Sequence, residues 1–133
     1  MRDLRAGAVS PHGPEIQEIS EASISNPVSE HWSPSERKAA RVVYDRALEK
    51  AREEVLDFHR NKTIAELDDL WEYEREIREW RKKLDYIFQY RYSFLDLCFA
   101  ISLRRGWLQQ DDLSGLSEER IARLNQIARI GDD

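Results

Sequence analysis

The stretch DDLWEYEREIREW, from Asp68 to Trp80, decides how this chain must fold. Eight of its thirteen residues are charged, yet it carries two tryptophans and a tyrosine. An α-helix turns about 100° per residue, so Trp71 and Trp80, nine residues apart, lie on opposite sides of a helix. The predicted helix therefore has two apolar faces. One is a heptad seam of Leu70, Tyr73, Ile77, Trp80, Leu84 and Ile87, and the other consists of Ile64, Leu67 and Trp71.

A single neighbouring helix cannot cover both of these faces. In one arrangement, the shorter face is buried between two subunits. In the other, Trp71 packs beneath shorter helices of its own chain. The residue pattern by itself leaves both arrangements open.

A second long helix is expected to precede this one. Ser33 suits the N-cap, Pro34 the first helical position, and Glu36 completes a capping box. A second capping box, at residues 63–66, leaves only a two-residue link, which predicts antiparallel neighbours. The apolar face of this first helix is Ala40, Val43, Tyr44, Ala47, Leu48, Ala51, Val55 and Phe58.

Two shorter helices are expected after the long pair. Residues 93–103 are apolar nearly all round, which predicts a buried helix ending at Gly106. Ser93 with Asp96 can cap a new start there, although a helix continuous with the preceding one is the alternative. Ser117 caps the last helix, whose apolar residues are Ile121, Leu124, Ile127 and Ile130.

The first 31 residues hold glycines, prolines and serines with no lasting periodicity. We therefore expect a disordered N-terminal tail at residues 1–31 and a helical domain at residues 32–133. A short docking segment within the tail is the alternative.

Composition argues against several classes of function. A net charge of −5 disfavours a nucleic-acid partner, and the absence of a long apolar run disfavours a membrane span. The one cysteine, Cys98, lies in an apolar run and is expected in the core. We expect a cytoplasmic protein that needs no cofactor or metal. Because no motif of catalytic or metal-ligating residues stands out, an enzyme is the minority interpretation.

From Asp68 onward the chain carries DDLW at 68–71, followed by Arg81, Asp85, Arg91, Ser93, Phe99, Ala100, Leu103 and Gly106. With these residues it resembles the fluorescence recovery protein family. These small all-helical dimers act on the orange carotenoid protein, which quenches the phycobilisome antenna when photoactivated, and they speed its return to the inactive orange form. The Trp-Ser start at residues 32–33 is also similar.

The resemblance implies an all-α fold in which two long antiparallel helices form a dimeric bundle and two shorter helices form a head. It also implies a homodimer that regulates a carotenoid-binding protein without catalysis. The expected dimer interface is Trp71, Leu67, Leu70, Ile64 and Arg81, and the expected partner-binding residues are Trp71, Glu74, Arg75, Arg81, Asp68 and Asp69.

One departure from the family concerns the two residues that follow Trp71 by three and four positions. The family has a His-Asp pair there, and this chain has Glu74 and Arg75. An arginine in place of the aspartate reverses a charge that is central to the family's activity. The alternative function is therefore a dimeric helical adaptor for a different protein partner.

Overall fold

The computed structural model describes residues 31–130, and all its regular elements are helical. The expected tail lies almost wholly outside the described residues. Within them, the predicted arrangement of two long helices followed by two shorter ones is confirmed. The elements are α3 (Pro34–Arg60), α4 (Leu67–Ile87), α5 (Leu95–Arg105), the 3₁₀ turn η3 (Gln110–Leu113) and α6 (Glu118–Ala128).

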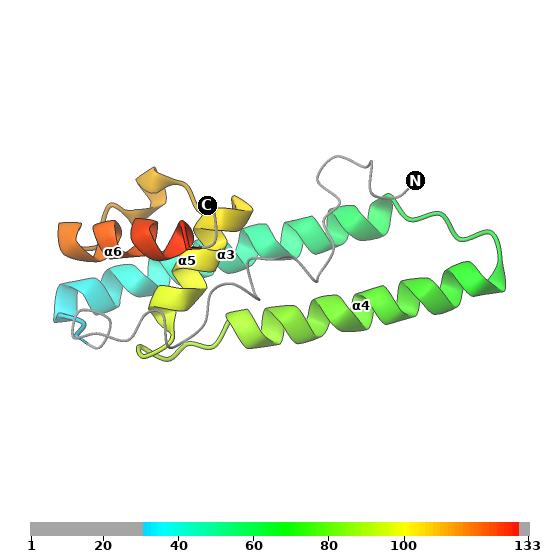
Figure 1. Ribbon diagram of the computed structural model, residues 1–133, viewed down its shortest axis with the longest axis horizontal. Helices are drawn as coiled ribbons and strands as arrows, with labels where there is room; N and C mark the ends of the chain where they lie inside the picture. Colours follow the sequence, from blue (N-terminus) through cyan, green and yellow to red (C-terminus); the bar gives the residue numbers. More distant parts are fainter. Residues whose placement is uncertain (1–30, 131–133) are drawn as a thin grey trace.

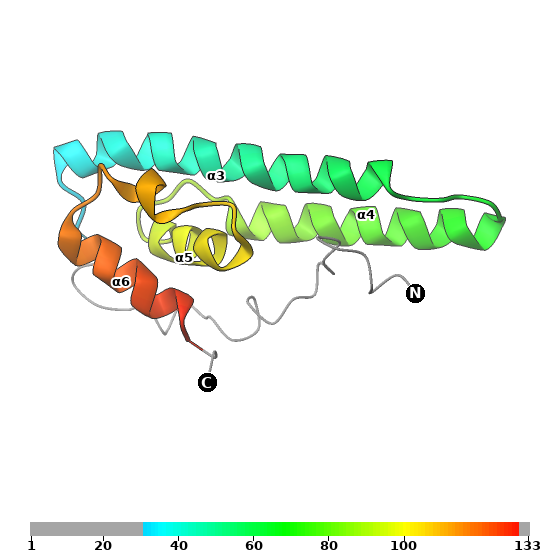
Figure 2. The same cartoon turned by 90° about the horizontal axis from the view of Figure 1, so that it is seen from above.

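Helices α3 and α4 run antiparallel as a long hairpin, with α5 and α6 gathered at one end of it (Figure 1). Seen from above, the head lies beside the first half of α3, and the far half of the hairpin extends away from it (Figure 2). The head therefore leaves the turn of the hairpin uncovered.

Ser33 caps α3 as predicted, because its Oγ accepts a hydrogen bond from the Glu36 N–H at 3.2 Å. The predicted role of Glu36 in a capping box is wrong. Its Oε2 instead accepts from the Ser117 N–H, 2.9 Å away at the start of α6. The glutamate therefore ties the head to α3 rather than closing a local motif.

The predicted capping box at Thr63 is also wrong, because α4 begins at Leu67. Asp69 Oδ2 accepts from the backbone N–H groups of Ala65 and Glu66, each at 3.0 Å. Because one carboxylate satisfies two backbone N–H groups, it stabilises a start of α4 at Leu67 rather than near Thr63. The link between the long helices is consequently six residues long, 61–66, rather than two.

Residues 88–94 separate α4 from α5, so the two helices are not continuous. The predicted cap by Ser93 and Asp96 is wrong: Phe94 occupies the N-cap position, and Asp96 pairs with Arg120. Gly106 ends α5 with a φ of +83°, a left-handed conformation that suits glycine. Ser117 caps α6 as predicted, accepting from the Arg120 N–H at 3.1 Å.

The core lies where the head meets the long helices. Burial raises the pKa of the Cys98 thiol, and the side chain is fully buried, as expected for a structural cysteine. The largest buried apolar side chains are Trp80, Phe94, Phe99, Ile87, Leu95, Leu97, Ile101, Leu108, Leu113 and Leu124.

Candidate functional site

The first turns of α4 project beyond the end of α3. Lys62, just past α3, pairs with Glu76 at 2.5 Å, and the Phe58 ring stacks on Tyr73 with centroids 6.3 Å apart. The last turn of α3 is therefore level with Tyr73 and Glu76. Figure 1 shows the start of α4 reaching past it, with the 61–66 link alongside.

This projection carries large exposed apolar side chains. Trp71 is 57 % exposed and Leu67 is 61 % exposed. The structure therefore excludes the arrangement in which Trp71 packs beneath the head. Leu70, predicted to belong to the heptad seam, is also exposed because α3 ends before reaching it. We call these residues the tip stripe: Ile64, Leu67, Leu70 and Trp71.

Trp80 lies on the other side of the same helix and is 1 % exposed. Its ring packs against Phe58, with centroids 6.4 Å apart, and the Arg105 guanidinium lies over it at 5.2 Å. The opposition of the two tryptophans predicted from their spacing is confirmed.

The charged residues expected to bind a partner lie in different settings. Asp68 is exposed, while Asp69 caps α4. Hydrogen bonds from the Ala65 and Glu66 N–H groups lower the pKa of Asp69.

Glu74 is exposed and forms an ion pair with Arg78, one helical turn later. The hydrogen bond from Arg78 lowers the pKa of Glu74, so it is ionised at neutral pH. Arg75 is exposed beside this pair. Because residues three and four apart share one side of a helix, Glu74 and Arg75 flank Trp71.

Arg81 lies away from the tip stripe, in a groove between the two long helices. The groove has a volume of about 490 Å³. We call it the α3–α4 groove, and its lining includes Leu48, Arg52, Val55, Ile77, Arg81 and Leu84. The structure thus divides the predicted site residues between two separate surfaces.

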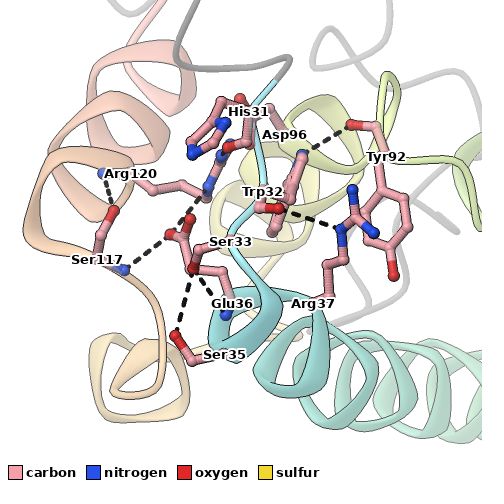
Figure 3. Close-up of polar contacts among 10 residues, drawn as sticks. All are labelled: His31, Trp32, Ser33, Ser35, Glu36, Arg37, Tyr92, Asp96, Ser117 and Arg120. Atoms are coloured by element: carbon pink, nitrogen blue, oxygen red, sulfur yellow. Dashed lines mark hydrogen bonds and ion pairs between the residues drawn. The ribbon is translucent and has the colours of Figure 1, made fainter.

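The head is held by a buried arginine that sequence reasoning missed (Figure 3). Arg120 is 1 % exposed, donates to Asp96 Oδ1 at 2.8 Å and to Glu36 Oε2 at 3.2 Å, and also donates to the His31 carbonyl. Its guanidinium lies 3.6 Å from the centre of the Trp32 ring. One side chain thereby joins α6 to α5, to α3 and to the residues just before α3.

A signal for Arg120 was present in the sequence. It lies four residues before Leu124 and seven before Ile127, which places it on the buried face of α6. Asp96, its partner, is the one charged residue in an apolar run. A charge at each of these places indicates a buried ion pair.

A second arginine clamps the head to both long helices. The Arg105 guanidinium lies 5.2 Å from the Trp80 ring centre and 5.1 Å from that of Trp107. Glu54, on α3, accepts from Arg105 Nη2 and from Trp107 Nε1, each at 2.8 Å. This cluster fixes the hairpin relative to the head.

Across residues 31–130 there is no cluster of side chains suited to a metal ion, and no helix is long and apolar enough to cross a membrane. The candidate binding surfaces are the exposed tip stripe and the α3–α4 groove.

Comparison with known proteins gives a consistent result. Residues 32–128 match the family described as photoprotection regulator fluorescence recovery protein. The fluorescence recovery protein of Synechocystis sp. is 24 % identical over 101 residues, which are 74 % of this chain and 93 % of that protein. The structure of the Fremyella diplosiphon fluorescence recovery protein superposes with a TM-score of 0.71 and 27 % identity, covering 75 % of this chain and all of the other.

Proposed function

Since this chain belongs to the fluorescence recovery protein family of photoprotection regulators, we propose that it is a homodimer that binds a protein of the orange carotenoid type and speeds its return to the inactive form. The single observation that carries the proposal is the tip stripe. It presents Trp71, Leu67 and Leu70 on the first turns of α4, and Ile64 in the link before them, where no other described part of the chain covers them.

Homodimer formation follows from the free energy of covering this stripe. Burying a large apolar side chain contributes about 1.5–3 kcal/mol, and a two-fold axis doubles every contact. Aromatic residues are also favoured at the centre of interfaces. The proposed interface is Trp71, Leu67, Leu70, Ile64 and, farther along α4 in the groove, Arg81.

Partner binding is assigned to the charged residues around the stripe. Asp68, Glu74 and Arg75 lie three or four residues from Trp71 on the same side of α4. Asp69 caps the start of the helix, and Arg81 lines the α3–α4 groove. A regulator of this kind acts by binding one conformation of its partner more tightly than the other, which shifts the equilibrium without making or breaking a bond.

A second candidate function rests on Glu74 and Arg75. Glu74 is engaged by Arg78, and Arg75 is exposed where the family carries an aspartate. A partner that fits this surface presents an acidic group to Arg75. The second candidate is therefore a dimeric adaptor for a different protein with such an acidic surface.

Recovery of a photoactivated orange carotenoid protein in the dark tests the proposal. Mixing it with this protein and following the red-to-orange change gives the acceleration directly, and co-sedimentation gives binding. Binding with acceleration supports the regulator. Absence of both, with this protein and with variants that restore the family's His-Asp pair, favours the adaptor.

A further inference from the structure

The lining of the α3–α4 groove is partly apolar and partly charged. Leu48 and Val55 from α3 face Ile77 and Leu84 from α4 across it. Its charged lining consists of Arg52, Arg81 and Asp85, so arginine predominates.

Three polar groups of the groove lack partners among the described residues. Trp80, which lines the groove, has a buried Nε1–H with no hydrogen-bond acceptor. Arg52 and Arg81 are exposed and form no salt bridge within residues 31–130. Arginine side chains pair well with carboxylates, so an occupant that supplies carboxylate oxygens is favoured at Arg52 and Arg81.

The chain itself contains a segment of matching chemistry. Residues 15–30 include four glutamates and no lysine or arginine. The same segment carries Ile16, Ile19 and Ile24. Its aliphatic side chains suit the apolar lining, its carboxylates suit the two arginines, and its backbone supplies carbonyl oxygens.

The segment is also within reach of the groove. Its far end is anchored at the head, where Trp32 Nε1 donates to the Tyr92 carbonyl at 3.1 Å and Arg120 holds the His31 carbonyl. Eight residues of extended chain, from Trp32 back to Ile24, span at most about 28 Å. Leu48 lies about 21 Å along the helix from Pro34, at about 1.5 Å per residue.

We propose that residues 15–30 dock in the α3–α4 groove of their own chain, with isoleucines on the apolar lining and glutamates against Arg52 and Arg81. A tethered segment has a high effective concentration at a site that it can reach, which favours it over a second copy. The family match begins only at residue 32, so this contact is a feature of this chain beyond its proposed function. The docked segment leaves the tip stripe exposed, and it competes for Arg81 with the dimer and partner contacts proposed above.

Disulfide trapping in the full chain tests the location. Ile19→Cys combined with Leu48→Cys should form a crosslink within one chain under mild oxidation. Cys98 does not interfere, because it is buried and its thiol pKa is raised. The matched control pairs Ile19→Cys with Val42→Cys, an exposed α3 residue outside the groove. A crosslink between chains, or equal crosslinking in the control, would overturn the proposal.

The indole N–H of Trp80 gives a second readout that does not depend on the position chosen for a cysteine. Its NMR resonance, assigned with Trp80→Phe, should move when Ile16, Ile19 and Ile24 are replaced by serine. The control replaces Leu4 and Val9 by serine, which removes apolar side chains outside the segment. No shift in the triple variant, together with no intrachain crosslink, excludes docking in the groove.

Discussion

Trp71 and Trp80 lie nine residues apart on one helix, yet Trp71 is 57 % exposed and Trp80 is 1 % exposed. They point in opposite directions from the helix axis, so one face of α4 is buried and the other is exposed. Trp80 joins the head to the hairpin, and Trp71 belongs to the surface assigned to the dimer. We therefore expect mutations on the two faces to separate the stability of the chain from its proposed dimerisation.

Trp80→Ala should lower the free energy of unfolding by about 3–5 kcal/mol, because it empties a buried site beneath Arg105 and Phe58. The loss should not depend on protein concentration. Trp71→Ala is the matched control on the other face, and its effect should vary with concentration, because it acts through association. Urea unfolding at two protein concentrations measures both. A concentration-dependent loss for Trp80→Ala would show that the two faces are not separable.

Arg120→Met should destabilise the chain by about 3–5 kcal/mol, because the carboxylates of Glu36 and Asp96 stay buried without their cation. Replacing Glu36 by glutamine and Asp96 by asparagine in the same chain removes those charges. The triple variant should then be more stable than Arg120→Met alone, as measured by thermal or urea unfolding. An Arg120→Met variant as stable as the unmodified protein would contradict the assignment of Arg120 as the head's central contact.

Asp96 makes a specific prediction about pH. Burial, with one oxygen left without a hydrogen bond, raises its pKa to about 6 despite the Arg120 guanidinium. Because the folded pKa lies above the ordinary value near 4, the proton bound to Asp96 stabilises the folded state. This contribution is present at low pH and is lost as pH rises through about 6.

Asp96→Asn should remove this part of the pH dependence. Unfolding free energies measured between pH 5 and pH 7 should decline with rising pH in the unmodified protein and stay flatter in the variant. Glu36 affects stability in a different pH range. Burial raises its pKa, but hydrogen bonds from Ser117 and the charge of Arg120 outweigh this effect, so that its pKa is lowered. Its stabilisation is lost only as pH falls below the ordinary glutamate range. If the unfolding free energy of Asp96→Asn declined with pH as steeply as that of the unmodified protein, Asp96 would not be the cause of the pH dependence.

Glu74→His combined with Arg75→Asp should increase the acceleration of orange carotenoid protein recovery by about tenfold or more. A charge left without its partner in an interface costs of order 2–5 kcal/mol, and 1.4 kcal/mol is a factor of ten in affinity. The helix should tolerate the change because both side chains are exposed. Rates of dark recovery with each variant give the comparison. Strong acceleration by the unmodified protein would show that Arg75 is accommodated, and the argument from charge reversal would be wrong.

Helix caps and helical periodicity depend on residues close together in the chain, so the sequence predicts them well. Ser33 and Ser117 were identified as caps, and the helical repeat separated Trp71 from Trp80. The start of α4 was missed because Thr63 and Asp69 offer competing caps, and the two hydrogen bonds accepted by Asp69 decide between them.

Contacts between residues far apart in the chain could not be predicted from local sequence patterns. Glu36 reads as the end of a capping box, but its carboxylate contacts Arg120, 84 residues away. Leu70 follows the heptad seam, yet the point at which α3 ends leaves it exposed. The spacing of apolar residues along one helix does not reveal how far its neighbour extends.

Sedimentation velocity at micromolar concentration tests the central claim, that the exposed tip stripe is a dimer interface. The unmodified chain should sediment as a dimer of the 15.8 kDa protomer. Trp71→Glu should sediment as a monomer with unchanged helicity, while Val42→Glu, at an exposed apolar residue outside the stripe, should remain dimeric. An unmodified protein that sediments as a monomer, or a Trp71→Glu variant that stays dimeric, would contradict the account.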